Sequence, residues 1–509
     1  MFGTNRMTPA SLQDAFRFGI RFPGLKSGAN RRDAFSILPA LCLSALFLLF
    51  TSASAADPSS PKGYAEVRHP NILFILVDDL GWKDLGSYGH EIHDTPNIDA
   101  LANQGMRFTN AYAACPICGP SRAAILTGKF PSNTGYVDNY ISQNIGGKLS
   151  RTPSGKLKGI KYKNPSFMKL KETTLAEAFQ TGGYQTGFLG KWHLTDSDNA
   201  RLPTDQGFDV NVAGGLWGSP RGMTGFFSPY QMAHLKDGPK GEYLPDRLTS
   251  EAIQVMDNFA KNDKPWLLYM SYYTVHAPFH SKPEKTKKYA GEKVKNARYA
   301  GMVDSMDENV GRLLDWLEEK GLRENTVVVF TSDNGGHMPA TNIEPLRSYK
   351  GSLYEGGIRV PCIIDWPGVT KPESVSDTPI HGVDFYATLL AIAGLPQQPD
   401  QHQDSVNLVP LLKGESDFER GPMIWHYPVG VPHMAHSHPG SVIREGDWKF
   451  LRFYADGREE LYNLKDDIGE TKNLVATMPE KAAELKAKLD ATLKAHEAII
   501  PIAVPAKPW

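Results

Sequence analysis

The chain has 509 residues, of which 41% are hydrophobic, 10% aromatic and 22% charged. These are ordinary values for a folded globular protein, and they exclude a collagen, a coiled coil and an intrinsically disordered chain. With 55 basic and 56 acidic residues the net charge is −1, so the chain lacks the basic surplus typical of nucleic-acid-binding proteins.

Residues 1–55 are predicted to be a signal peptide. Arg31 and Arg32 precede an apolar-biased run over 35–50, and Ala53-Ser54-Ala55 has the small-x-small pattern of a cleavage site. The run is shorter than the roughly 20 residues of a spanning helix, which favours cleavage over an uncleaved anchor. The leader holds six basic and two acidic residues, so the mature chain has 454 residues and a net charge of −5. We expect a secreted or periplasmic protein with no membrane attachment after cleavage.

The first predicted strand ends in two carboxylates. Residues 71–77 form a continuous apolar run, as in a strand buried on both faces, and Asp78 and Asp79 follow directly. A helix is predicted over 97–104, and Cys118 precedes a second helix over 121–126.

Three later strands also lead into polar residues at their carboxyl ends. The strand over 186–189 is followed by Gly190-Lys191-Trp192-His193, the strand over 266–271 by a loop with His276, and the strand over 326–330 by Asp333 and Asn334. Further helices are predicted over 175–180, 246–260 and 298–320. Alternating strands and helices indicate an α/β fold with a large, mixed, mostly parallel sheet flanked by helices, which binds ligands at the carboxyl ends of its strands.

The pattern changes near residue 420. Segments 441–454 and 460–463 are typical of an antiparallel meander, and 480–495 of a closing helix. We therefore predict a catalytic α/β domain over 64–420 and a smaller C-terminal α+β subdomain over 421–509. The Lys-rich segment 148–171 is interpreted as a solvated surface insertion. Four histidines lie in a Pro/Gly-rich loop that we expect to shape a substrate pocket rather than to bind metal: His426, His433, His436 and His438.

Asp78, Asp79, Asp333 and Asn334 offer oxygen donors at two strand ends. Such residues often serve only as helix caps and turns. Adjacent carboxylates repel each other, however, unless a proton or a cation compensates them. Donor sets made of oxygen alone favour Ca²⁺ or Mg²⁺ over zinc or copper.

Cys118 has several possible roles. With Cys115 it forms a C-x-x-C pair, as in a redox motif or half of a zinc site. A zinc site would need a second pair of cysteines, but after removal of the leader only Cys362 remains. A redox pair would normally open the helix of a thioredoxin-like unit, and no such unit precedes Cys115. Three cysteines also argue against a disulfide scaffold. A cysteine before a helix start, with Arg122 four residues on, fits a nucleophile that meets an anion.

The segment Cys118-x-Pro120-Ser121-Arg122 with Leu126-Thr127-Gly128 resembles the signature of the sulfatase family, and residues 183–193 resemble a second signature of the same family. The resemblance runs from about Pro70 to the end of the chain and includes 332–336, 349–351 and 355–361. It implies an alkaline-phosphatase-like fold and an arylsulfatase-like sulfuric ester hydrolase that depends on formylglycine. Thr195 departs from the glycine of many relatives, which bears on substrate detail at most.

The resemblance also implies roles for individual residues. A maturation enzyme would oxidise Cys118 to formylglycine (3-oxoalanine), and residue 118 would hold Ca²⁺, or Mg²⁺, with Asp78, Asp79, Asp333 and Asn334. The hydrated aldehyde would attack sulfur while Lys191 and Lys350 bind sulfate oxygens. His276 would protonate the leaving alcohol, and His193 would take the proton that lets the aldehyde re-form. The catalytic set is Cys118, Arg122, Lys191, His193, His276 and Lys350.

The substrate is expected to be a sulfated carbohydrate or an aryl sulfate, as in polysaccharide degradation. Side chains that could line its pocket are Trp192, Trp217, Arg221, His280 and Arg359. Two alternatives remain open: a phosphate or phosphonate monoester hydrolase on the same scaffold, and a non-catalytic protein that binds sulfated glycans. Asn334 weighs against the first because two-metal phosphatases need further Asp and His ligands at that position. The intact set of basic residues weighs against the second.

Overall fold

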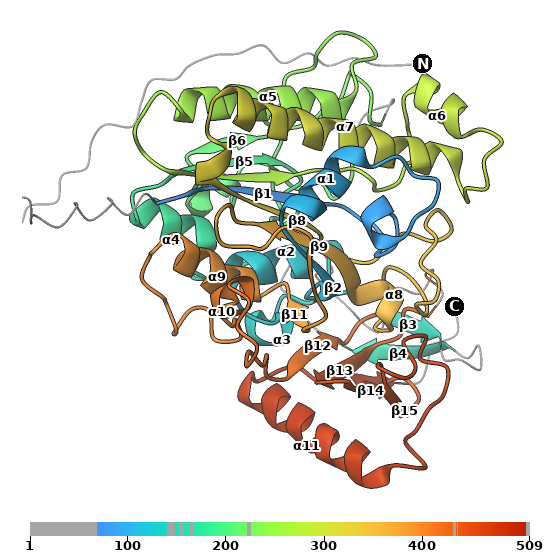
Figure 1. Cartoon of the computed structure of the whole chain (residues 1–509). Coiled ribbons are helices and arrows are strands. Elements are labelled where there is room, and N and C mark those ends of the chain that lie inside the picture. Colours follow the sequence, from blue (N-terminus) through green and yellow to red (C-terminus); the bar gives the residue numbers. More distant parts are fainter. Residues whose placement is uncertain are drawn as a thin grey trace, which may run out of the picture. The chain divides into compact units, whose positions relative to one another are not determined.

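A nine-stranded sheet forms the centre of the described structure (Figure 1). The computed structural model describes residues 69–139, 148–151, 157–161, 167–220, 225–430, 434 and 436–504. The strands follow the order β10-β2-β9-β8-β1-β7-β5-β6, and β11 also pairs with β2. Within this sheet β9 alone runs antiparallel to its neighbours. The predicted large, mixed and mostly parallel sheet is therefore confirmed.

The bounds of these strands are β1 (Asn71–Val77), β2 (Met106–Tyr112), β5 (Gln185–Gly190), β6 (Val210–Val212), β7 (Trp266–Ser271), β8 (Thr326–Ser332), β9 (Arg359–Asp365), β10 (Ser374–Ser376) and β11 (Ile380–His381).

Helices cover both faces of the sheet, as the apolar run of β1 requires. Successive side chains of a strand point to opposite faces: Leu73 and Ile75 pack in one hydrophobic core, and Phe74 and Leu76 in the other. The first core is covered by α1 (Pro96–Gln104), α5 (Leu244–Phe259) and α7 (Ala297–Glu319), the second by α2 (Cys118–Thr127), α4 (Leu175–Thr181) and α9 (Asp384–Ile392) (Figure 1). All five predicted helices of this region lie within a few residues of the expected bounds.

Local sequence explains where several of these helices begin. Thr174 and Glu177 form a capping box at the start of α4, and the Asn296 side chain accepts hydrogen bonds from the first backbone N–H groups of α7. Shorter elements complete the chain: α3 (Pro131–Thr134), α6 (Pro283–Tyr289), α8 (Glu355–Ile358), α10 (Val409–Leu412) and the 3₁₀ turns η1 (Gly86–Tyr88), η2 (Pro203–Gln206) and η3 (Arg323–Asn325).

A separate antiparallel sheet follows near the C-terminus, as predicted. It consists of β12 (Met423–Tyr427), β13 (Gly440–Glu445), β14 (Trp448–Phe453) and β15 (Glu459–Asn463), and α11 (Pro479–Ala495) packs on it. The predicted segment 441–454 is two strands, because Gly446 adopts a left-handed φ of 56° and turns the chain there. Residues from Ala65 onward cluster as one compact unit, so the division at 420/421 stays a prediction about architecture within that unit.

A third, three-stranded antiparallel sheet pairs β3 (Lys148–Arg151), β4 (Leu157–Lys161) and β16 (Ile502–Val504). The segment 148–171, expected to be a plain surface insertion, thus holds two paired strands. The predicted leader, 1–55, lies outside the described residues. Among the helices of the described ranges, none is long and apolar enough to cross a membrane.

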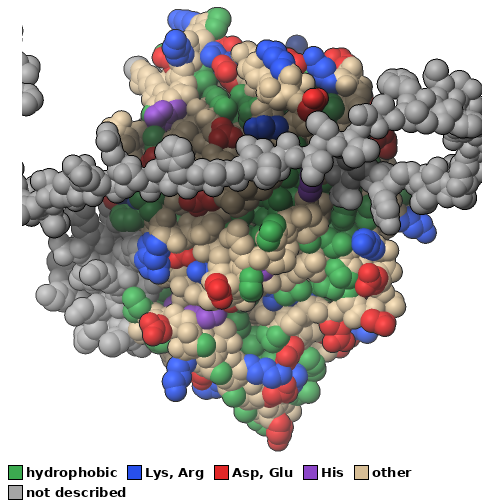
Figure 2. Space-filling model, turned by 90° about the vertical axis from the view of Figure 1, so that its left-hand side faces the viewer, with side chains coloured by type: hydrophobic (Ala, Val, Ile, Leu, Met, Phe, Trp, Pro, Cys, Tyr) green, Lys and Arg blue, Asp and Glu red, His purple; other side chains and the backbone are tan. Residues whose placement is uncertain are grey.

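Charged side chains of both signs are interspersed on the face drawn in Figure 2. This distribution agrees with a net charge close to zero and with the absence of a basic surplus.

Candidate active site

Strand register brings the polar strand ends together. Val77 pairs with Ser332, Leu76 with Ser271, and Gly190 also with Ser271. The carboxyl ends of β5, β7, β1 and β8 therefore lie side by side. Residues that follow these strands meet at one edge of the sheet, where open α/β sheets bind their ligands.

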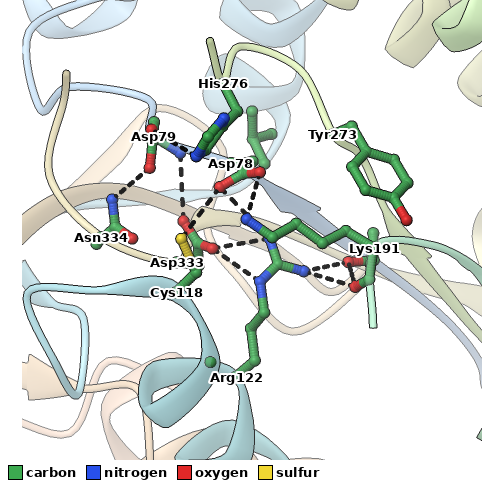
Figure 3. Close-up of polar contacts among 12 residues, drawn as sticks. Asp78, Asp79, Cys118, Arg122, Lys191, Tyr273, His276, Asp333 and Asn334 are labelled. Atoms are coloured by element: carbon green, nitrogen blue, oxygen red, sulfur yellow. Dashed lines mark hydrogen bonds and ion pairs between the residues drawn. The ribbon is translucent and has the colours of Figure 1, made fainter. Parts of the chain in front are cut away.

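Four oxygen-donor residues converge at this edge (Figure 3). Asp78, Asp79, Asp333 and Asn334 are all fully buried. The Asp79 backbone N–H donates to Asp333 Oδ1 at 3.2 Å, and Asn334 Nδ2 donates to Asp79 Oδ1 at 2.8 Å. Asp79 has a φ of 64°, a left-handed conformation that aspartate tolerates better than most residues.

Cys118 is the first residue of α2 and faces these carboxylates. Its Sγ lies 3.6 Å from Asp78 Oδ1, and its side chain is buried. The next residue, Gly119, donates its N–H to Asn139 Oδ1 at 2.6 Å, which satisfies one of the unpaired donors at the helix start. Ile117, the N-cap residue, makes no side-chain hydrogen bond to the helix.

Arg122 ties the helix to the strand ends. Its Nε and Nη2 both lie 2.8 Å from Asp333 Oδ2. Its Nη1 donates to the Lys191 carbonyl at 2.8 Å and to Ser271 Oγ at 2.5 Å. Hydrogen bonds from Nε and Nη1 and the ion-pair contact of Nη2 together hold the planar guanidinium in one orientation, which a lysine could not reproduce.

Two lysines pair with the two aspartates that follow β1. Lys191 Nζ lies 2.6 Å from Asp78 Oδ2, and Lys350 Nζ lies 2.6 Å from Asp79 Oδ1. Both lysines are buried. Buried ammonium groups persist when paired with anions, and here the two aspartates supply that pairing.

His276 lies on the other side of Asp79. Its Nε2 is 3.6 Å from Asp79 Oδ2, and its Nδ1 lies 2.6 Å from the Ala277 carbonyl. The side chain keeps an exposed fraction of 20%, so a substrate can reach it. Burial and the Lys350 charge lower the pKa of His276 to about 3, against the opposing effect of Asp79.

His193 approaches from the loop after β5. Burial, with the charges of Lys191 and Arg122 nearby, holds the pKa of His193 well below its usual range, so its imidazole is neutral. Its Nδ1 is buried without a hydrogen-bond partner among the described residues. Gly218 packs on the ring so closely that an added Cβ would lie 2.4 Å from His193 Cε1.

Cys118 is not a reactive thiol as it stands. Burial raises the pKa of its thiol to about 12, although the Lys191 and Lys350 charges oppose the rise. Because the thiolate is the nucleophilic form, such a cysteine is nearly inert at neutral pH. All three described cysteines, Cys115, Cys118 and Cys362, are buried and free.

The oxygen donors fit a hard divalent cation. Burial and the neighbouring Asp333 and Asp79 carboxylates raise the pKa of Asp78 to about 8, although Lys191 and Arg122 oppose the rise. A carboxylate in this position needs more positive charge than the side chains supply. The buried Oδ1 of Asn334 has no hydrogen-bond partner among the described residues and is thus available as a ligand. Asp78, Asp79, Cys118 and His276 place one ligand atom each within 4.8 Å of one another.

The predicted pocket residues do not all lie at the site. Trp217 precedes Gly218 and is half-buried, and His280 is half-buried four residues beyond His276. Arg359 is not brought to the site: it is buried on β9, and its Nε lies 2.7 Å from Glu355 Oε2. Arg221 lies outside the described residues.

The histidine-rich loop has two distinct parts. His426 is buried on β12, and its Nδ1 lies 2.7 Å from Ser441 Oγ; it belongs to neither group of possible metal ligands found among the described residues. Further along, Met434 Sδ lies 2.8 Å from the position of a Cβ on Gly351. The loop therefore packs beside the residue that follows Lys350, in keeping with a role in shaping the pocket.

Three residues of the site escape sequence reasoning. Ser271 Oγ donates to the Lys191 carbonyl at 2.7 Å and accepts from Arg122; its place at the end of a predicted strand was the available signal. Asn139 caps the N–H of Gly119, and no local pattern marks it. His337 follows Gly335-Gly336 and lies beside His276.

Comparisons with known proteins agree with this geometry. Residues 70–395 match a family model described as Sulfatase, and residues 349–498 match one described as N-sulphoglucosamine sulphohydrolase, C-terminal. A protein named Sulfatase from Formosa agariphila is 33% identical, over 88% of this chain and 92% of its own length. Arylsulfatase A from Homo sapiens is 31% identical, over 85% of this chain and 90% of its own. The crystal structure of Ps i-CgsB in complex with k-i-k-neocarrahexaose is similar with a TM-score of 0.71 and 28% identity, over 84% of this chain and 93% of that one.

Proposed function

Since this chain belongs to the sulfatase family, it is a sulfate ester hydrolase, and we propose that it is an exported enzyme that desulfates carbohydrates. The proposal includes formylglycine at position 118 and a Ca²⁺ ion beside it. One observation carries it: Cys118, the first residue of α2, lies within the electrostatic reach of three buried cationic side chains, Arg122, Lys191 and Lys350. A tetrahedral oxyanion is a ligand that such a group of cations binds.

The inert thiol of Cys118 supports its modification. A buried thiol with a pKa raised to about 12 does not attack an ester at neutral pH. Formylglycine would supply a hydrated aldehyde hydroxyl as the nucleophile, and Ca²⁺ would neutralise negative charge near it. Asp78, Asp79, Asp333 and Asn334 are the residues that would hold the ion with residue 118.

The remaining side chains bind the sulfate and move protons. Lys191 and Lys350 are the ammonium groups within reach of sulfate oxygens bound at residue 118, and Asp333 holds Arg122 in place. His193, neutral and with an unpartnered Nδ1, is suited to accept a proton.

His276 is our choice to donate a proton to the departing alcohol. Burial and Lys350 oppose protonation of its imidazole. A bound sulfate ester adds a negative charge beside Lys350 and so favours the imidazolium form.

A carbohydrate substrate and export rest on separate support. The Ps i-CgsB structure contains a neocarrahexaose, and the N-terminal 55 residues have the pattern of a signal peptide. The partners implied are a sulfated glycan or aryl sulfate and a formylglycine-generating maturation enzyme.

The test is release of inorganic sulfate from a panel of sulfated glycans and aryl sulfates by enzyme from an exporting host. The wild type is expected to release sulfate, and Cys118→Ala to stay at background with an unchanged melting temperature, since the hydrogen bond of the Cys118 side chain found among the described residues is long, at 3.6 Å. p-Nitrophenyl phosphate and phenylphosphonate esters serve as controls. Faster turnover of these esters would favour the phosphoester alternative, and glycan binding without turnover would favour the binding-protein alternative.

A further inference from the structure

His337 lies beside the candidate active site and has no part in the mechanism above. Its ring centre is 6.5 Å from that of His276, and the charges of Asp79 and Lys350 both act on it. The side chain is half-buried, so part of the imidazole is accessible beside the position assigned to the leaving alcohol.

The backbone around His337 is held rigidly. Gly335 donates its N–H to the Gly357 carbonyl at 3.0 Å, and Lys350 donates its N–H to the Gly336 carbonyl at 3.0 Å. A Cβ on Gly335 would lie 2.0 Å from the Gly356 carbonyl oxygen, so this segment has no room to shift. Phe279 packs edge-on against the His337 ring at 5.7 Å. The imidazole is thus positioned before substrate arrives.

The two ring nitrogens of His337 are not equivalent. Nδ1 is buried and has no hydrogen-bond partner among the described residues. Burial lowers the pKa of His337, although a backbone hydrogen bond with Met338 opposes the shift, so the ring is neutral at pH 7. A neutral imidazole carries one N–H donor and one acceptor nitrogen. The accessible part of the ring can therefore form a hydrogen bond with a hydroxyl group, which both donates and accepts.

We infer that His337 is a specificity-determining residue that forms a hydrogen bond with a hydroxyl group on the carbon next to the sulfated one. This inference rests on the proposed function. With His276 at the ester oxygen, a ring centred 6.5 Å away reaches a neighbouring substituent, because a hydrogen bond spans about 2.9 Å. The substrate class is then an ester whose alcohol carries a vicinal oxygen, as sugars do.

The test compares two aryl esters of the same composition, 2-hydroxyphenyl sulfate and 4-hydroxyphenyl sulfate. Only the first places a hydroxyl next to the ester. The ratio of their kcat/KM values is measured for the wild type, His337→Phe and His337→Gln. Phenylalanine keeps a ring without a hydrogen-bonding atom, and glutamine keeps both a donor and an acceptor. His69→Ala is the matched control, because His69 precedes β1 at the end of the strand opposite Asp78.

The ratio is expected to fall about 3- to 10-fold in His337→Phe, the factor of one neutral hydrogen bond, and to recover in part in His337→Gln. The inhibition constant of inorganic sulfate is expected to stay within twofold, since His337 contacts the alcohol and not the sulfate. An unchanged ratio, or an equal fall for both esters, would overturn the assignment of His337. Absence of sulfate release by the wild type from both esters and from the panel of sulfated glycans, with formylglycine present, would instead overturn the proposed function.

Discussion

Replacing Arg122 with lysine keeps the positive charge and removes the planar guanidinium. The arginine makes three hydrogen bonds, one from Nε to Asp333 and one each from Nη1 to Lys191 and Ser271, and its Nη2 forms an ion pair with Asp333. A lysine has a single nitrogen, which cannot occupy the Nε and Nη1 positions at once and so keeps the contacts of one of them at best. Loss of one or two charged hydrogen bonds is worth about 1.5 to 6 kcal/mol of stability before relaxation. A misplaced charge beside the reacting sulfate is expected to lower kcat/KM by about 100-fold or more.

Arg420 offers a matched control for this change. Its side chain has the same 3% exposure as that of Arg122, and it forks on the buried Asp384 with Nη2–Oδ1 at 2.8 Å. It is not part of the candidate site. Arg420→Lys and Arg122→Lys should lower the urea midpoint by similar amounts, while sulfate release falls far more in Arg122→Lys. Equal losses of activity in the two variants, or activity of Arg122→Lys within fivefold of the wild type, would refute a catalytic role for Arg122.

Three further predictions concern the metal site, His193 and the C-terminal sheet. Asn334→Ala should weaken Ca²⁺ binding by about tenfold, measured by calorimetry on chelator-treated protein, because it removes the unpartnered Oδ1; unchanged affinity would contradict the ligand assignment. Gly218→Ala should lower kcat about tenfold or more, since the new Cβ meets the His193 ring at 2.4 Å, whereas Gly421→Ala, which has open space, should match the wild type in the same assay. Burial and the Glu355 carboxylate raise the pKa of Glu470 to about 7, although the Lys449 charge opposes the rise. The folded state therefore binds this proton more tightly than the unfolded chain does. As a result, the free energy of unfolding falls as pH rises from about 4.5 through 7. In Glu470→Gln the difference between the urea midpoints at pH 5 and pH 8 should be smaller than in the wild type. An equal difference in both proteins would show that Glu470 is not the group responsible.

The sequence predicted the parts of the site that depend on local pattern. Apolar runs that stop at Asp78 or Asp333 mark buried strands and their ends, and parallel pairing then aligns those ends without further information. The motif around Cys118 marked the helix start in the same way. These features are found in the structure as expected because each depends on only a few consecutive residues.

Residues that depend on long-range packing were not predictable. Arg359 follows a glycine pair and was expected near substrate, but β9 runs antiparallel and buries it against Glu355 and over the Tyr112 ring at 5.4 Å. The neighbouring sequence does not determine to which face of the sheet an arginine on a central strand points. Asn139 accepts the hydrogen bond of the Gly119 N–H from 20 residues away. Strand β4, which pairs with β3, also pairs with β16 near the C-terminal end of the chain. Such pairings appear only once the fold is formed.

The central claim is that Cys118 is converted to formylglycine in a site built for sulfate. Peptide mass spectrometry of protein from the native host, on the peptide that contains Cys118, tests it most directly. The account predicts a mass lower by about 18 Da at that residue, or its hydrated equivalent. An intact thiol in a host able to perform the oxidation would contradict it, because a buried thiol with a pKa near 12 cannot serve as the nucleophile.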